Sequence, residues 1–313
     1  MNKYKNILKI KELYERGENI IQYLRSSDNA DTNSINDILI SYDLQSGTYL
    51  KSLSENSEFK ERYAESIAAV IEELLPAGNL KSIMEIGVGE ATTLGLMIKN
   101  LKSIPEDILG FDISLSRILF AQNFLKEINL PPVKLFTANL FEIPLKDDSV
   151  DIVYTSHSIE PNGGNEKTAL KELFRVARKY VILLEPSYEF ATEEGKSRME
   201  KNGYVKYLAK HATELGYKVI ENKLFDLSIN HLNPTGITII EKLSMGDETT
   251  ELVCPATRTK LNIYNHNLLY SDESFLAYPV IENIPCLLTE NAILSFHLKT
   301  DFQHFKQQNN LSF

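Results

Sequence analysis

Short apolar runs alternate with amphipathic helical segments between residues 82 and 243, and no other feature constrains the fold as strongly. In the segments between these runs, apolar residues recur three or four positions apart, as on one face of a helix. This alternation predicts an α/β fold with a mostly parallel sheet that is covered by helices on both faces. The expected strands are residues 82–88, 108–113, 133–137, 150–155, 180–184, 218–225 and 236–243.

Different patterns flank this central region. Before residue 76, apolar residues keep a helical spacing that one polar segment interrupts, and the Pro-Ala-Gly turn at residues 76–78 ends the pattern. After residue 246, short strand-like pieces, turns and a polar tail replace the long alternation. We therefore divide the chain into an N-terminal helical segment (1–75), a central domain (76–246) and a small C-terminal α+β domain (247–313).

The composition excludes several classes of protein. The chain has 43 acidic and 33 basic residues, a formal net charge of −10. Because phosphate binding needs a basic surface, this balance disfavours a nucleic-acid partner. The apolar runs are far shorter than the roughly 20 residues of a membrane span, and the N-terminus lacks the apolar stretch of a secretory signal. The two cysteines, Cys254 and Cys286, fit a reducing compartment, so we expect a cytoplasmic protein.

The segment IMEIGVGEATTL, residues 83–94, follows the first expected strand with a glycine turn and a helix start. Gly87 and Gly89 allow a tight turn and a close approach of the backbone to a ligand. A dinucleotide fingerprint would need a third glycine where Thr92 stands, so a nicotinamide or flavin dinucleotide is disfavoured. Glu85 adds a carboxylate just before the turn, which suits an ammonium group better than a phosphate.

Polar residues also end the next two strands. Asp112 lies at the end of the second strand, a position from which an acid typically accepts hydrogen bonds from a ribose diol. Asn139 follows the third strand, where its amide could bind the edge of an adenine. In parallel sheets, ligands bind outside the carboxyl ends of the strands, so we expect these side chains to meet at one site.

This ordered series resembles the class I S-adenosylmethionine (SAM)-dependent methyltransferases, especially the small-molecule branch related to the quinone-biosynthesis methyltransferases. The resemblance covers roughly residues 80–185. It implies a Rossmann-like, doubly wound, seven-stranded sheet with an N-terminal helical cap. It also implies that the chain binds S-adenosyl-L-methionine and releases S-adenosyl-L-homocysteine. The cofactor contacts expected on this basis are Glu85, Gly87, Gly89, Thr92, Asp112, Ile113, Asn139, Leu140 and Ser156.

The loop after the fourth strand, residues 154–165, reads YTSHSIEPNGGN and is the natural place for catalysis. His157 is the best general base, because an unperturbed imidazole titrates near pH ~6.5. Glu160 could orient it or bind a cationic acceptor. Alternatively, His157 only lines the pocket beside the methionine part of the cofactor. An Asn/Asp-Pro-Pro-aromatic motif, used by family members that methylate amino groups of adenine or glutamine, is absent, which disfavours those substrates.

Substrate contacts are expected from three further places. In related methyltransferases, an N-terminal cap closes over the cofactor with an aromatic and polar stretch similar to SYDLQSGTY, residues 41–49. We therefore expect Tyr42, Gln45 and Tyr49 to line the pocket; the alternative is a helix connection with packing tyrosines. Asn162 in the NGGN turn and Tyr188 after the fifth strand are the other expected contacts, unless they belong to a mobile turn and to the surface.

Two C-terminal segments, LVCPATRTKL (252–261) and LAYPVIENIPCLL (276–288), resemble the small zinc-ribbon family that includes the activator subunit of tRNA and protein methyltransferases. Zinc needs about four Cys or His ligands. Here Thr257 replaces the second cysteine of Cys-x-x-Cys, and Cys286 stands where the family has an apolar residue. We therefore expect no metal. The domain should either pack on the catalytic domain or form a homodimer contact.

Together these features predict an enzyme, a SAM-dependent methyltransferase that acts on a small-molecule or sugar-like metabolite, with oxygen as the expected acceptor atom. One alternative is an RNA or protein methyltransferase that uses the activator-like C-terminal domain. Another is a scaffold protein that binds SAM without turnover.

Overall fold

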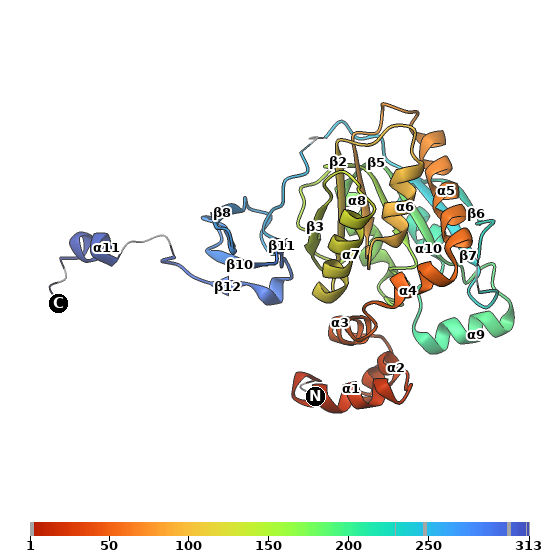
Figure 1. Cartoon of the computed structure of the whole chain (residues 1–313), viewed down its shortest axis with the longest axis horizontal. Helices are drawn as coiled ribbons and strands as arrows, with labels where there is room; N and C mark the ends of the chain where they lie inside the picture. The colour runs from red at the N-terminus through yellow and green to blue at the C-terminus, as the bar shows by residue number, and fades with distance from the viewer. Residues whose placement is uncertain (1–2, 229, 247–248, 299–301, 311, 313) are drawn as a thin grey trace.

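The computed structural model describes residues 3–228, 230–246, 249–298, 302–310 and 312. Its centre is a seven-stranded sheet with the strand order β3-β2-β1-β4-β5-β7-β6 (Figure 1). Strands β1 to β5 run parallel, and β7 runs antiparallel to both of its neighbours. All seven expected strands are present, so the predicted fold class is confirmed. Their bounds are β1 Ser82–Ile86, β2 Asp107–Asp112, β3 Lys134–Thr137, β4 Val150–Ser156, β5 Ala177–Pro186, β6 Lys218–Leu224 and β7 Thr235–Glu241.

Helices cover both faces of this sheet and create two hydrophobic cores. Ile83 and Met84 are neighbours in β1 but belong to different cores, because successive side chains of a strand point to opposite faces. One core includes apolar residues of α5, α6 and α7, and the other includes those of α8 and α10. The bounds are α5 Ser57–Leu74, α6 Thr92–Asn100, α7 Leu115–Glu127, α8 Glu166–Val176 and α10 Leu208–Glu214.

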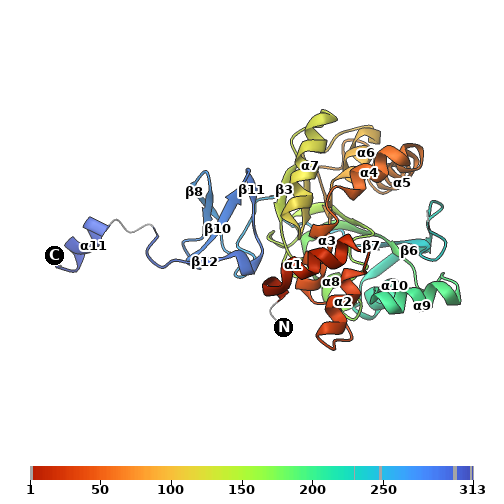
Figure 2. The same ribbon diagram turned by 60° about the horizontal axis from the view of Figure 1, so that its bottom comes forward.

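The N-terminal helices lie across the end of the sheet where the parallel strands finish (Figures 1 and 2). A small core of Ile10, Ile20, Leu24 and Ile40 holds the first of them together. Asn33 Nδ2 donates to the main-chain oxygen of Pro161 at 2.8 Å and thereby ties this segment to the loop after β4. The helices are α1 Ile7–Glu15, α2 Ile20–Ser27, α3 Ile35–Leu44 and α4 Thr48–Glu55, and α9 (Glu193–Asn202) lies beside them.

The C-terminal residues form a second, small sheet with the order β11-β10-β9-β8, in which β12 also pairs with β10. This sheet continues onto the edge of the large one, because the Leu287 N–H donates to the Thr137 carbonyl of β3 at 2.9 Å. Packing on the central domain, one of the two expected arrangements, is therefore observed (Figure 2). The elements are β8 Asn262–Asn265, β9 Leu268–Tyr270, β10 Leu276–Ile281, β11 Ile284–Pro285, β12 Ile293–Leu294 and α11 Phe302–Gln308.

Cys254 and Cys286 are free thiols buried in this C-terminal part. The Cys254 Sγ lies 3.3 Å from the Tyr278 hydroxyl. Among the described residues, no three His, Cys, Asp or Glu side chains are grouped as a metal site requires. Within the same residues, no helix combines the length and the apolar character that crossing a membrane would demand.

Candidate functional site

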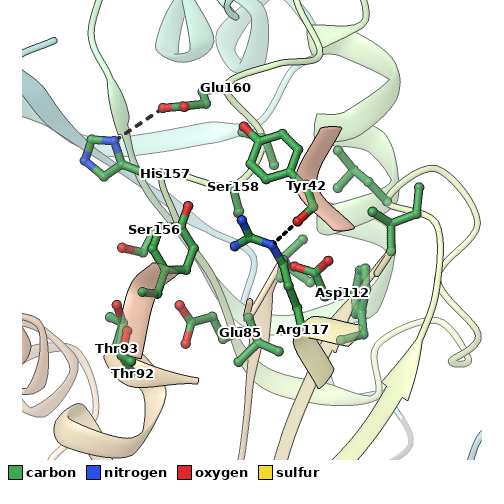
Figure 3. A pocket seen from close by; sticks show the side chains of 18 of the residues that line it. Tyr42, Glu85, Thr92, Thr93, Asp112, Arg117, Ser156, His157, Ser158 and Glu160 are labelled. Atoms are coloured by element: carbon green, nitrogen blue, oxygen red, sulfur yellow. Dashed lines mark hydrogen bonds and ion pairs between the residues drawn. The ribbon is translucent and has the colours of Figure 1, made fainter. Parts of the chain in front are cut away.

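A cavity of about 340 Å³ lies at the carboxyl ends of the parallel strands, between the sheet and the N-terminal helices (Figure 3). β1 pairs with β2 on one side and with β4 on the other, so the strand order changes direction here. Such a switch point separates the loops that leave neighbouring strands and opens a crevice for a ligand. The site residues expected from three adjacent strands therefore reach one cavity.

The turn after β1 depends on glycine, which has no side chain, at positions 87 and 89. Gly87 has φ +62° and Gly89 has φ +54°, a conformation that L side chains rarely adopt. A Cβ atom on Gly87 would lie 2.5 Å from the Cβ of Ser158, so the loop after β4 can pack on the turn only because position 87 is glycine. Gly87 lines the cavity, whereas Gly89 lies under the ring of Tyr49 and is not part of the lining.

Glu85 lies at the base of the cavity and is only 2% exposed. Its Oε2 accepts a hydrogen bond of 2.8 Å from the Tyr154 hydroxyl. Burial raises the pKa of Glu85 to about 8, although the bond from Tyr154 acts in the opposite direction. A cationic ligand group beside this carboxyl would favour its ionised form.

Asp112 is held by two backbone groups. The Gly89 N–H donates to its Oδ2 at 3.1 Å, and the Ser114 N–H donates to its Oδ1 at 2.9 Å. Burial raises the pKa of Asp112, while the charge of Arg117 lowers it. Since each carboxylate oxygen can accept a second bond, Asp112 can still bind a pair of hydroxyl groups.

The third expected strand end supplies an amide in an apolar setting. The Asn139 Oδ1 accepts from the Phe141 N–H at 3.1 Å, so its NH₂ group remains as the donor for a ligand. Ile113 and Leu140 line the cavity as well and offer apolar surface for a flat ring. Thr92 and Ser156, also expected cofactor contacts, are part of the same lining.

His157 follows β4 in a left-handed conformation, with φ +53°. Its Nδ1 lies 3.4 Å from Glu160 Oε2, and its Nε2 lies 2.8 Å from the Thr235 hydroxyl. Burial lowers the pKa of His157, but the hydrogen bond and charge of Glu160 and the charge of Glu185 outweigh it, so the pKa is raised. Both expected catalytic residues line the cavity and interact with each other (Figure 3).

Glu185, at the end of β5, fixes the loop that carries His157 and was not singled out by sequence reasoning. It is 2% exposed, and its Oε1 accepts from the N–H groups of Ser158 at 3.1 Å and Ile159 at 3.3 Å. Burial raises the pKa of Glu185 to about 7. Its place as an acid at the end of a strand is the sequence signal that could have identified Glu185, as it identified Asp112.

The N-terminal segment covers the cavity with Tyr42 and Tyr49, both of which line it. Arg117 lies between them, 5.1 Å from the ring centroid of Tyr42 and 4.5 Å from that of Tyr49. It is 1% exposed, and its Nη2 has no partner among the described residues. Glu90 adds a second tie, because its carboxylate accepts the N–H groups of Gly47 at 2.8 Å and Leu50 at 2.7 Å.

The other expected substrate contacts divide into two groups. Asn162 lines the cavity, but Gln45 and Tyr188 do not. Gln45 follows the last residue of α3, and its Nε2 donates to the Ser41 carbonyl of that helix. The Tyr188 hydroxyl donates to Glu200 Oε1 at 2.8 Å outside the cavity. Several lining residues were not anticipated, since nothing in the sequence links them to this site: Phe59, Lys60 and Tyr63 of α5, and Asn230, Asn233 and Thr235 near β7.

The sequence of residues 84–184, from β1 to β5, matches the family model described as a methyltransferase domain. This match confirms the prediction of a methyltransferase domain at this place in the chain, and with it the expected enzyme class and the cofactor SAM. The residues present also fit that cofactor, because two buried acids and an amide in apolar surroundings lie at three neighbouring strand ends.

Solved structures similar to part of the chain include magnesium protoporphyrin IX methyltransferase from Synechocystis PCC 6803 with bound SAH, at 16% identity, covering 59% of this chain and 84% of that one, with a TM-score of 0.46. A SAM-dependent methyltransferase from Aquifex aeolicus has 16% identity, coverages of 62% and 96%, and a TM-score of 0.44. The methyltransferase domain of the bacterial protein CtHen1-CN has 25% identity, coverages of 57% and 98%, and a TM-score of 0.43.

These TM-scores are below 0.5, so the fold assignment depends on the strand order itself. A comparison with curated proteins found no match.

Proposed function

We propose that this protein transfers a methyl group from SAM to an oxygen atom of a small-molecule acceptor, in keeping with the small-molecule branch that the sequence resembles. The observation that carries the proposal is the meeting of Glu85, Asp112 and Asn139 with His157 and Glu160 at one cavity. The first three residues match the ammonium, ribose and adenine of the cofactor. The last two supply a polar, titratable group beside it.

Each cofactor contact follows from the chemistry of the side chain. Glu85 would pair with the ammonium of the methionine part, and Asp112 would accept hydrogen bonds from the two ribose hydroxyls. The free NH₂ of Asn139 would donate to the adenine, and Ile113 and Leu140 would offer apolar surface for its ring. Gly87 lets the backbone approach the ligand closely.

When bound, SAM supplies a methyl group on a positively charged sulfur, which is an electrophile. The chain's own residues position the acceptor, exclude water and remove a proton. Glu160 holds the Nδ1–H tautomer of His157, which leaves the Nε2 lone pair to accept the proton of an acceptor hydroxyl. Nε2 is within hydrogen-bond distance of the Thr235 hydroxyl, which the acceptor hydroxyl would replace.

The covering by N-terminal helices supports a small acceptor. Tyr42 and Tyr49 of the N-terminal segment line the cavity, and Phe59 and Tyr63 bring further aromatic surface to it. A cavity of about 340 Å³, covered in this way, suits a metabolite better than a folded macromolecule. We accordingly assign residues 1–75 as a cap, 76–246 as the methyltransferase domain and 247–313 as an accessory domain.

For the accessory domain, we propose a supporting role within this chain. The hydrogen bond between Leu287 and Thr137 extends the sheet past β3 and covers an edge that would otherwise be open. The domain exposes Ile263, Leu294 and Phe296, which supports a homodimer contact there. The two buried free thiols fit a cytoplasmic location.

Calorimetry with SAM tests the cofactor assignment. We expect binding by the wild-type protein and a loss of about tenfold to hundredfold per hydrogen bond in Asp112→Ala, since bonds to a charged group contribute about 1.5–3 kcal/mol each. Asp226→Ala, an exposed acid outside the cavity, is the control and should bind SAM as wild type does. Absence of binding, or equal binding by Asp112→Ala, would refute the assignment.

A further inference from the structure

Lys60 is a cationic residue of the cavity that the proposed reaction leaves without a role. It lies in the first turn of α5 and lines the cavity together with Phe59 and Tyr63 of the same helix. The side chain is half-buried, and burial lowers its pKa. No described residue forms a hydrogen bond or an ion pair with its ammonium group.

The acids around this part of the site are already engaged. Glu160 pairs with His157, and Glu185 accepts two backbone N–H groups of the following loop. Glu85 accepts from Tyr154 at the base of the cavity. A half-buried ammonium without a counter-charge is costly, so its charge is available to a ligand.

The position of Lys60 links it to the acceptor side of the cavity. Tyr63, one helical turn further along α5, has its hydroxyl 3.2 Å from Ser156 Oγ at the end of β4, directly before His157. The positive charge of Lys60 also lowers the pKa of His157, which means that the two groups interact electrostatically. By contrast, the residues matched to the ribose and the adenine lie at the ends of β2 and β3.

A second donor is available on the same cavity. Asn230 lies between β6 and β7, and its Oδ1 accepts from the Leu232 N–H at 3.0 Å. Its side-chain NH₂ is therefore the group that can face a ligand. The ammonium of Lys60 can give a carboxylate a charge-assisted hydrogen bond, and the Asn230 amide is a further donor on the same cavity.

We propose that the methyl acceptor carries a carboxylate that binds Lys60, while its hydroxyl faces His157 and its apolar body lies against Phe59 and Tyr63. This inference rests on the proposed function and specifies its substrate class, a small hydroxycarboxylic acid. A carboxylate fits better than a phosphate, because a dianion would meet Glu85, Glu160 and Asp112 on the same cavity. Of the two cations in its lining, Arg117 already interacts with Asp112, which leaves Lys60 to compensate the added charge.

Calorimetry on the full chain saturated with S-adenosyl-L-homocysteine (SAH) tests this proposal. The probes are 3-(4-hydroxyphenyl)propanoate, its neutral amide and 2-(4-hydroxyphenyl)ethyl phosphate. We expect wild type to bind the acid at least about tenfold more tightly than the amide, the effect of one net ion pair in a partly buried site. Lys60→Met should remove this preference, Lys60→Arg should keep it, and Lys51→Met, at an exposed position of α4, should behave as wild type.

The outcomes separate this proposal from the function on which it rests. If wild type binds SAH but binds the acid no more tightly than the amide, or binds neither probe, the carboxylate subsite is refuted and the proposed function is not. If SAH does not bind, the proposed function fails and takes the subsite with it. If wild type binds the phosphate probe more tightly than the acid, the choice of a carboxylate over a phosphate is overturned. If Lys60→Met weakens SAH binding as strongly as acid binding, Lys60 serves the methionine carboxylate of the cofactor and the proposal is overturned.

Discussion

Arg117 Nε donates a hydrogen bond of 2.8 Å to the main-chain oxygen of Tyr42, and this bond joins the helix after β2 to the N-terminal cap. The guanidinium lies between two tyrosine rings of that cap, in contact distance for cation–π interaction with both. Asp112 is in the same loop region and lowers the energetic cost of the buried positive charge. The N-terminal helices are thus attached beside Asp112, the proposed ribose contact.

From this contact we predict that Arg117→Lys loosens the cap. Lysine keeps the charge but loses the planar group that donates to Tyr42 and stacks on the rings. Hydrogen exchange measured by mass spectrometry should show faster exchange of residues 42–50, and SAM should bind about tenfold more weakly. Arg62→Lys, an exposed position on α5, is the matched control. Unchanged exchange in Arg117→Lys would contradict this role of Arg117.

The raised pKa of Glu85 predicts a proton linkage. Because its pKa is about 8, the carboxyl of the free protein is mostly protonated at pH 7, and it must ionise to pair with an ammonium. SAM binding should therefore release a proton, and affinity should rise from about pH 6 to 7.5, by at most tenfold per unit. Calorimetry in buffers of different ionisation enthalpy measures the release.

Glu85→Gln is the informative variant for this linkage. It should bind SAM more weakly and release no proton at position 85, and the stability of the ligand-free protein should depend less on pH between about 4.5 and 8. The sign follows from the raised pKa, since an acid kept neutral by burial contributes stability at low pH that is lost as the pH rises toward about 8. Equal proton release by wild type and Glu85→Gln would count against the assignment.

The pair His157 and Glu160 predicts a shift in the pH–rate profile. Only the neutral imidazole accepts a proton, so the rate should rise with pH through the pKa of His157. Glu160 raises this pKa, so Glu160→Gln should move the rise to lower pH. His157→Asn should lower the rate by about 10²–10⁴-fold, the usual contribution of a general base. An unchanged profile in Glu160→Gln would show that His157 only lines the pocket.

Gly87 and Gly216 both have a positive φ, so a comparison of the two positions measures what the close packing at Gly87 costs. Gly216 has φ +82° and open space where a Cβ would be added, so Gly216→Ala should cost only the strain of the left-handed conformation, about 1–2 kcal/mol. Gly87→Ala adds a contact of 2.5 Å with Ser158, and overpacking costs about 1–3 kcal/mol more. Urea unfolding compares them; equal losses would show that the loop after β4 moves aside.

Much of this architecture was predictable because it depends on local pattern. Buried parallel strands appear as short apolar runs, and the turn after the first strand needs glycine whatever the rest of the chain does. Glu85, Asp112 and Asn139 were found for a topological reason, since residues at the carboxyl ends of adjacent parallel strands meet at one edge. The approach of Glu160 to His157 follows from their separation of three positions in one loop.

Contacts between distant segments were beyond that reasoning. Arg117 looks like an ordinary helix residue until α3 places Tyr42 beside it, and Glu185 looks like one more acid until its carboxylate meets the loop after β4. Gln45 and Tyr188 have the right chemistry for a substrate contact, yet helix geometry and a bond to Glu200 keep them outside the cavity. Side-chain direction is decided by tertiary packing, which local sequence does not encode.

Strand periodicity and strand-end chemistry are local properties, so the amino-acid sequence was enough to predict the sheet, the glycine turn and the class of cofactor. The folded structure was needed to establish which residues close the cavity and that Lys60 lies within it without a counter-ion among the described residues. The physical reason is that a pocket forms where helices far apart in the chain pack over the sheet, and burial there changes what a charged side chain can do.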